Sequence, residues 1–139
     1  MRWLGLDVGR RRIGIALSDP LGLFAQGYSV LERSQSLSQD LEYLSDVIAR
    51  ETVEEIVIGL PKNMNGTEGP MAEEVRDFGR RLEEKTGLPV IFWDERLTTL
   101  AAERTLLEAD LSRKKRKQKI DQVAAVFILQ NYLDYRRKG

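Results

Sequence analysis

The first 31 residues carry three short apolar runs separated by connections of only a few residues. The runs occupy residues 2–8, 13–17 and 26–31, and glycine, proline and charged residues fill the gaps. A parallel connection needs a crossover of about a dozen or more residues, so connections this short leave only antiparallel pairing. The sequence therefore predicts that the chain begins with a three-stranded antiparallel meander.

After the meander the apolar spacing becomes that of amphipathic helices alternating with short strands. One helical stripe begins at Leu37 with Ser36 as its cap, and another begins at Met71, between Pro70 and Gly87. The remaining expected elements are two strands and two further helices, at 55–59, 89–93, about 98–111 and roughly 119–136. Strands reached through helical crossovers are parallel neighbours. We expect one α/β domain over residues 1–139, with a mixed five-stranded sheet of three antiparallel and then two parallel strands, flanked by helices.

Three acidic residues occupy positions where the apolar pattern predicts hydrophobic side chains. Asp7 lies in an otherwise apolar first strand, Glu95 follows the last strand, and Asp121 falls among the apolar positions of the final helix. Burying an unpaired carboxylate is costly, and a divalent cation among several carboxylates offsets that cost. Because ligands gather beyond the carboxyl ends of parallel strands, Asp7 and Glu95 are expected to converge there. The three acids are the predicted catalytic groups and metal ligands.

Each acid also has a structural interpretation. Asp7 could pair with an arginine, and Asp121 could complement the dipole of its helix. Glu95 could pair with Arg96 or cap a helix. Asp94 competes with Glu95 for the role of ligand, because a bulge at the strand end would exchange their orientations.

The amino-acid composition excludes several catalytic mechanisms. The chain has no cysteine and no histidine, which excludes Ser-His-Asp, Cys-His and zinc-imidazole mechanisms. Oxygen ligands remain, and these suit a hard divalent cation such as Mg²⁺ or Mn²⁺. Apolar residues make up 42% of the chain, which indicates a folded core, yet no run of them is long enough to cross a membrane. We expect a cytoplasmic protein without a signal peptide.

The 22 basic and 22 acidic residues cancel, but the basic ones are clustered. Arg10–Arg12 form one cluster just after Asp7, and residues 113–119 form another just before Asp121. The loop 59–70 ends at a helix N-terminus, where free amides attract anions. A solvated helix face or a plain flexible connection would explain the same features. The predicted nucleic-acid-binding residues are Arg10, Lys62, Asn63, Arg96, Lys114, Lys115, Arg116 and Lys117.

Several motifs resemble those of one family along the whole chain. They are Gly5-Leu6-Asp7-Val8-Gly9, Arg12-Ile13-Gly14-Ile15-Ala16, Gly59-Leu60-Pro61, the run from Asn63 to Pro70, Asp94-Glu95-Arg96-Leu97-Thr98-Thr99 and Asp121-Gln122-Val123-Ala124-Ala125. Together they resemble the YqgF family, also called RuvX, whose members are described as candidate Holliday junction resolvases or candidate pre-16S rRNA nucleases. The resemblance implies a ribonuclease H-like fold and places metal-binding carboxylates at Asp7, Glu95 and Asp121. It also implies a bacterial cytoplasmic nuclease that matures the 5′ end of small-subunit ribosomal RNA.

The sequence departs from this family pattern in two places. Related junction resolvases carry a fourth acid in the last helix, where this chain has Ala124 and Ala125. Many relatives have aspartate in place of Asn65. The first departure bears on how strongly two metal ions would be held, and the second changes the charge of a loop.

The leading hypothesis is a nuclease dependent on Mg²⁺ or Mn²⁺ that acts on structured RNA, with pre-ribosomal particles as partners. Branched DNA is the alternative substrate, and it would favour a homodimer over a monomer because two symmetric cuts need two sites. A second class of hypothesis is a nucleic-acid-binding factor without catalysis, which the balanced charge favours. A third is an ATP-binding protein of the actin and sugar-kinase type, but such proteins enclose a cleft between two domains.

Overall fold

The computed structural model describes residues 1–97 and 113–138, and it describes side chains for residues 1–96 and 122–138. Its elements are, in chain order, β1 Arg2–Val8, β2 Arg12–Ser18, β3 Ala25–Glu32, α1 Leu37–Arg50, β4 Val53–Leu60, α2 Pro70–Thr86, β5 Val90–Asp94, a short 3-10 turn Glu95–Leu97, and α4 Arg113–Lys138. The helix expected at about 98–111 lies outside the described residues.

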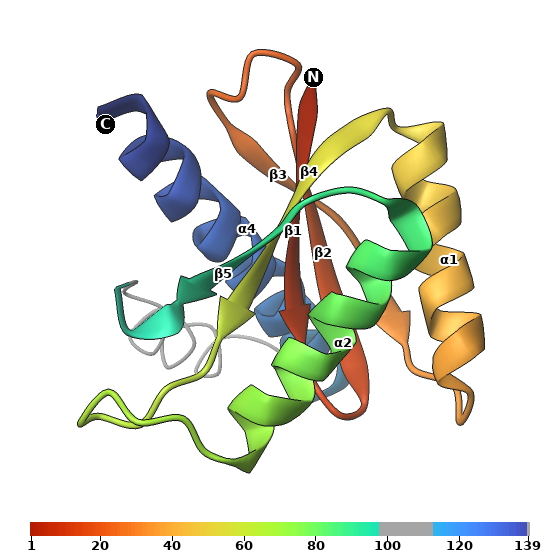
Figure 1. Cartoon of the computed structure of the whole chain (residues 1–139), viewed down its shortest axis with the longest axis vertical. Helices are drawn as coiled ribbons and strands as arrows, with labels where there is room; N and C mark the ends of the chain where they lie inside the picture. Colours follow the sequence, from red (N-terminus) through yellow and green to blue (C-terminus); the bar gives the residue numbers. More distant parts are fainter. Residues whose placement is uncertain (98–112, 139) are drawn as a thin grey trace.

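The five strands form one mixed sheet in the order β3-β2-β1-β4-β5. β2 pairs antiparallel with β1 and with β3, whereas β4 pairs parallel with β1 and with β5. Helices α1 and α2 cover one face of the sheet and α4 crosses the other (Figure 1). The expected meander and the two parallel crossover strands are therefore confirmed, and β1 lies at the centre of the sheet.

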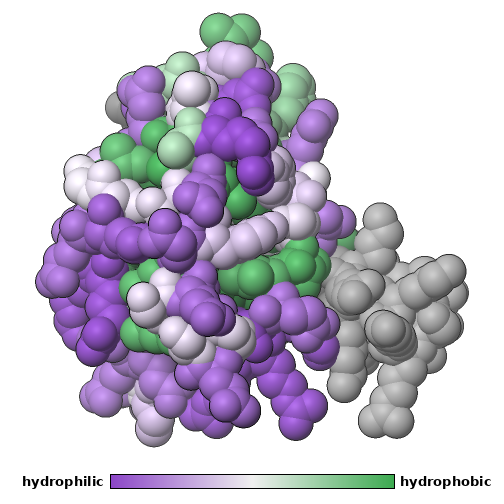
Figure 2. Space-filling view, turned by 90° about the vertical axis from the view of Figure 1, so that its right-hand side faces the viewer, coloured by the Kyte–Doolittle hydropathy of each residue, from purple (hydrophilic) through white to green (hydrophobic). Residues whose placement is uncertain are grey.

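The ends of α1 and α2 follow from the residues found there. The Ser36 hydroxyl accepts a hydrogen bond from the Gln39 amide at 3.3 Å, as an N-cap does. Pro70 begins α2, and Gly87 ends it in the left-handed conformation that glycine adopts without strain. Both helices bury one stripe against the sheet, and the surface on the α1 side of the molecule is mostly hydrophilic (Figure 2).

Helix α4 lies antiparallel to β1 and is fixed to it by an aromatic cluster. The Glu55 carboxylate accepts hydrogen bonds from Trp3 Nε1 at 2.9 Å and from the Tyr132 hydroxyl at 3.0 Å. Burial, and then the bond to Glu55, raise the pKa of Tyr132 to about 12. One turn further along, the guanidinium of Arg136 lies 4.7 Å from the centre of the Trp3 ring. The C-terminal end of α4 is thus packed beside the start of β1.

The expected start of the last helix, near residue 119, is wrong. Helix α4 begins at Arg113, so the basic run lies inside the helix. Lysine and arginine are good helix formers, but they add no apolar periodicity, which is why the pattern understated the length of the helix. Among the described residues, no helix is long and apolar enough to cross a membrane.

Gly5 lies where α4 packs closely against the sheet. A Cβ at Gly5 would lie 2.6 Å from the Leu129 Cβ and 3.1 Å from the Ala125 carbonyl oxygen. Neither atom is the end of a flexible side chain, so Gly5→Ala must move the helix. We expect the free energy of unfolding, measured in urea, to fall by about 1–3 kcal/mol, as in other overpacked cores.

A matched control for Gly5→Ala is Gly27→Ala, because Gly27 is also a strand glycine beneath α4. The three atoms nearest to a Cβ there all belong to the Gln122 side chain, which can rotate away. Gly27→Ala should therefore change stability far less than Gly5→Ala. Equal urea midpoints for the two variants would show that the helix is not held this closely at Gly5.

Candidate functional site

The carboxyl ends of three parallel strands meet at one edge of the sheet, the lower edge in Figure 1. The strand β4 lies between β1 and β5, with Leu6 of β1 opposite Ile58 and Asp94 of β5 opposite Leu60. Asp7 follows Leu6 directly, and Glu95 follows Asp94. The two predicted acids therefore stand on either side of the end of β4.

Asp7 and Glu95 also share one face of the sheet. Asp7 alternates with Leu6 and Val8, which are in the core under α1 and α2, so it lies on the α4 face with Trp3. On that face, Glu95 Oε1 lies 2.7 Å from the position that a Cβ would take on Gly59. The missing side chain at Gly59 thus leaves room for the Glu95 carboxylate, and Ile128 of α4 packs against the same spot.

Asp94 has a different environment from Glu95. It lies on the same face of β5 as Val90 and Phe92, which pack against the core on the α1 and α2 side. The Arg96 guanidinium grips its carboxylate in a fork, with Nη2 to Oδ2 at 2.7 Å and Nε to Oδ1 at 3.1 Å. The Arg96 amide donates to it as well, at 2.9 Å. These bonds, the Arg96 side chain first, lower the pKa of Asp94.

Asp121 lies in the α4 backbone, but its side chain is outside the described residues. The helix direction gives its approximate position along the sheet. Arg136 lies over Trp3, and Ala125 and Leu129 lie over Gly5, so the chain runs toward the Asp7 end as residue numbers fall. One more turn back from Ala125 reaches residue 121.

The positions where related resolvases carry a fourth acid are filled by packing residues. Ala124 and Ala125 are both fully buried, with no exposed surface. Among the described side chains no three acids form a metal-binding cluster, and Asp121 is not one of those side chains. The donor set nevertheless fits a hard divalent cation, because Asp7 and the Glu95 carboxylate over Gly59 offer only oxygen atoms at one edge.

The loop between β4 and α2 is shaped by its own hydrogen bonds. Asn63 donates from its backbone to the Thr67 carbonyl at 2.8 Å and from its side chain to the Thr67 hydroxyl at 2.9 Å. Asn65 accepts from the same hydroxyl at 2.6 Å. Gly66 closes the turn with a φ of +88°. A loop with these bonds has a defined shape, and Asn63 helps to build it.

Arg96 connects this loop to the end of β5. Besides gripping Asp94, its Nη1 donates to the Met64 carbonyl at 3.3 Å. Lys62 is half-buried nearby and adds, after Arg96, to lowering the pKa of Asp94. Arg96 and Lys62 therefore lie at the same edge as the two acids, and Arg96 already has protein partners.

Arg10 is exposed on the turn between β1 and β2. Its Nε forms an ion pair with Glu74 of α2 at 3.2 Å, with both side chains more than half exposed. Exposed pairs of this kind contribute about 0–1 kcal/mol, so a phosphate could replace Glu74 at little cost. The side chains of Lys114, Lys115, Arg116 and Lys117 lie outside the described residues, although their backbone belongs to α4.

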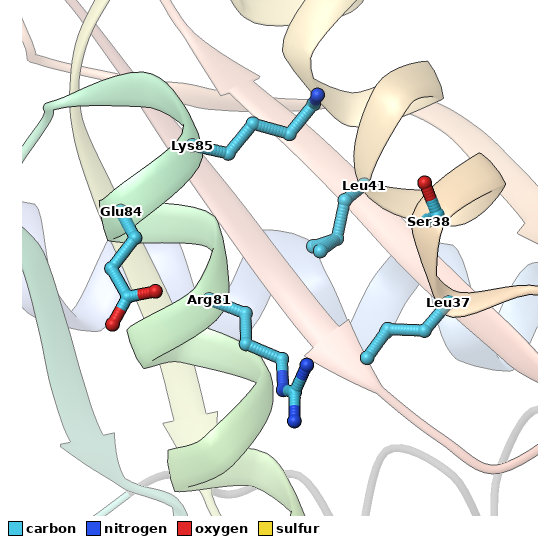
Figure 3. Close-up of a pocket in the computed structure, with 6 residues that line it drawn as sticks. All are labelled: Leu37, Ser38, Leu41, Arg81, Glu84 and Lys85. Atoms are coloured by element: carbon cyan, nitrogen blue, oxygen red, sulfur yellow. The ribbon is translucent and has the colours of Figure 1, made fainter.

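A shallow groove lies on the other side of the sheet, away from these acids. Leu37 and Leu41 of α1 line one wall, and Arg81 and Lys85 of α2 line the other (Figure 3). Lys85 is paired with Glu42 at 2.7 Å. The groove contains no group of converging acids and does not overlap the sheet edge described above.

Sequence reasoning missed the part played by Gly59. It was expected as the last residue of a strand and as part of a family motif, and the structure adds that it gives Glu95 its room. A signal was present, because a glycine within an apolar strand often marks a close approach by another group. Which group approaches could not be read from the pattern alone.

Comparison with known proteins agrees with this architecture. The RuvX family, described as Holliday junction resolvase, matches residues 1–135. A candidate pre-16S rRNA nuclease of Moorella thermoacetica is 60% identical over 134 residues, covering 96% of this chain and 95% of the relative. Another, of Carboxydothermus hydrogenoformans, is 54% identical over 139 residues and covers both chains completely.

Solved structures with little sequence similarity share the fold. T. thermophilus RuvC in complex with a Holliday junction substrate superposes with a TM-score of 0.64 at 15% identity, covering 100% of this chain and 97% of RuvC. The yeast mitochondrial Holliday junction resolvase Ydc2 gives 0.55 at 11% identity, covering 98% and 79%. These likenesses show that the expected ribonuclease H-like fold is correct.

Proposed function

Because the chain belongs to the RuvX family, we propose that it is a nuclease that uses a divalent cation to hydrolyse phosphodiester bonds at the 5′ end of precursor 16S rRNA. The observation that carries the proposal is the placement of Asp7 and Glu95 on one face of the sheet, on either side of Gly59. Relatives more than half identical over nearly their whole length carry the pre-16S rRNA name, which favours this substrate. The protein would act in the cytoplasm on pre-ribosomal particles.

The proposed cation, Mg²⁺ or Mn²⁺, would be held by the carboxylates of Asp7, Glu95 and Asp121. When bound, such an ion makes water a better nucleophile and neutralises charge on phosphate oxygens. Asp7 is on the central strand, where it pairs with Gly14 of β2 and follows Leu6, which pairs with Ile58 of β4, so its backbone cannot shift easily. Packing against Gly59 and Ile128 restricts Glu95 to a small region. These two residues would therefore fix where the reacting phosphate stands.

The nucleic acid would be bound by basic residues around the same edge. Arg10 lies three residues after Asp7, and its ion pair with Glu74 is exposed, so a phosphate could displace it. Lys62 and Arg96 flank the other side of the edge, next to the loop between β4 and α2. The proposed contacts from residues 114–117 would come from the start of α4. A phosphate backbone crossing this edge would pass directly over both acids.

The second candidate substrate is a four-way DNA junction. The RuvX family is described as Holliday junction resolvase, and this description is what favours it. Two symmetric cuts would need a homodimer, whereas trimming of RNA needs only a monomer. A binding factor without catalysis is the remaining alternative, and the buried Ala124 and Ala125 in place of a fourth acid favour it.

A cleavage assay with the purified protein tests the proposal. The substrates are a 5′ precursor fragment of 16S rRNA and a synthetic four-way DNA junction, each with Mg²⁺, Mn²⁺ or EDTA. We expect the RNA to be cut with either metal, the junction to be cut more slowly, and EDTA to stop both reactions. Cutting in EDTA would exclude the metal mechanism. Tight, salt-sensitive binding without cutting of either substrate would make the protein a binding factor.

A further inference from the structure

Asp40 is a buried carboxylate that the proposed chemistry does not use. It lies in the first turn of α1 and is only 2% exposed. A buried carboxylate is tolerated only when it is paired and hydrogen-bonded. The groups that bind Asp40 are therefore restrained together with it. Ser34 supplies two of them, its amide at 3.0 Å and its hydroxyl at 3.1 Å from Oδ1. Arg33 supplies the third, with Nε at 3.4 Å from Oδ2.

Arg33 also forms hydrogen bonds to the turn between β1 and β2. Its Nη1 donates to the Gly9 carbonyl at 2.9 Å, and its backbone amide donates to the Arg11 carbonyl at 2.8 Å. The guanidinium also lies over the Phe78 ring, with Cζ 5.3 Å from its centre, and Phe78 is buried in the core. The guanidinium is therefore held by its bonds to Asp40 and Gly9 and by its contact with the Phe78 ring.

The turn that Arg33 holds is the one that follows Asp7. It is tight, because the Gly9 amide donates to the Arg12 carbonyl at 2.9 Å and a Cβ on Gly9 would lie 2.9 Å from the same oxygen. Arg10 and Arg11 project from it into solvent. The turn and the start of α1 lie at the same end of the molecule, the lower end in Figure 1. Gly9 thus connects the Arg33 hydrogen bonds to the end of β1 that carries Asp7.

We infer that Arg33, held by the buried Asp40, is a positioning residue for this nuclease. It fixes the Gly9 carbonyl, and with it both the end of β1 that carries Asp7 and the direction in which Arg10 meets a phosphate. The inference rests on the proposed function, since it concerns the geometry of the same site. It adds two residues, 33 and 40, that touch neither the cation nor the nucleic acid.

The first test is Arg33→Lys, which keeps the positive charge. One ammonium group cannot bind Asp40, reach the Gly9 carbonyl and lie over Phe78 together, so the turn should loosen while the domain stays folded. We expect the Gly9 amide to exchange with solvent about tenfold faster, while the amide of Ile15 in β2 keeps its rate. In the cleavage assay kcat should fall about tenfold with KM within about twofold, because a slightly displaced catalytic group slows the chemical step.

The matched control is Arg50→Lys. Arg50 also donates a hydrogen bond to a neighbour, the Tyr28 hydroxyl at 3.0 Å, but it stands at the opposite end of α1. It should leave kcat and the Gly9 exchange rate unchanged. Asp40→Asn is the second variant, and it should show the same two effects as Arg33→Lys even if the lysine variant does not fold.

The two proposals can fail separately. If wild type cuts and Arg33→Lys matches it in kcat and in Gly9 exchange, the positioning role is wrong. If Gly9 and Ile15 exchange faster by the same factor, the change is general destabilisation, and the positioning role is again wrong. If wild type cuts neither substrate, the proposed function fails. Exchange at Gly9 then decides whether Arg33 anchors the turn.

Discussion

Replacing Asp7 with asparagine should abolish cleavage while leaving the fold intact. Asparagine has nearly the same shape, so packing on the α4 face beside Trp3 and Gly5 is kept. The negative charge that would hold the cation is lost, and we expect kcat to fall by a factor of about 10³ or more, as when a catalytic group is removed. The measurement is the initial rate of cutting of the 5′ precursor fragment at saturating Mg²⁺.

Two further measurements separate loss of chemistry from loss of structure in Asp7→Asn. Asparagine fills the same space in this half-buried position and can still form hydrogen bonds, so the free energy of unfolding should stay within about 1 kcal/mol of wild type. Binding of the uncut RNA should be at least as tight as in wild type, because the variant removes one negative charge that would repel the phosphates. Asp46→Asn, on the exposed side of α1, is the matched control and should cut normally. Cutting by Asp7→Asn at the wild-type rate would place the site elsewhere.

Much of the fold could be predicted because its strand connections are short and its helices are amphipathic. The antiparallel meander follows from gaps too short for a crossover, and the structure pairs those strands as expected. The caps at Ser36 and Gly87 are local signals that depend on a few neighbouring residues. The start of α4 was misplaced because its first turns are basic and carry no apolar stripe.

The candidate site was only partly predictable, because its contacts come from distant parts of the chain. Alternation along a strand indicated that Asp7 lies in an unusual position, and that information is local. The link from Arg33 to Gly9 spans 24 residues and depends on how the start of α1 packs on the turn. No spacing rule gives such a contact. The same holds for Arg96, whose bond to the Met64 carbonyl joins two loops.

The choice between Asp94 and Glu95 illustrates this limit most clearly. Strand alternation ends at Asp94, and Glu95 begins a 3-10 turn, so the period of two no longer says which way the side chain points. In the structure, Asp94 is gripped by Arg96, whereas Glu95 lies over Gly59 on the same face as Asp7. This geometry favours Glu95 as the ligand, and the assignment stays a prediction.

The adjacent acids allow a direct comparison of two variants. Glu95→Gln keeps the length of the side chain and its packing on Gly59 but removes the charge, so we expect kcat to fall by about 10²–10³. Asp94→Asn removes the charge that Arg96 grips, which should loosen the connection to the loop at Met64. Its effect should therefore be a KM raised by a few-fold with kcat nearly unchanged. Both variants are assayed on the 5′ precursor fragment over a range of Mg²⁺ concentrations.

The metal dependence makes the comparison decisive. If Glu95 is a ligand, Glu95→Gln should need far more Mg²⁺ to reach its half-maximal rate, whereas Asp94→Asn should need the same amount as wild type. The reverse result would identify Asp94 as the ligand. Arg96 would then have to release Asp94 when substrate binds, and the strand end would have to turn that carboxylate from the α2 face to the face that carries Asp7. Because such a change breaks the pairing of Asp94 with Leu60 as well as the ion pair with Arg96, we expect Glu95 to prove the ligand.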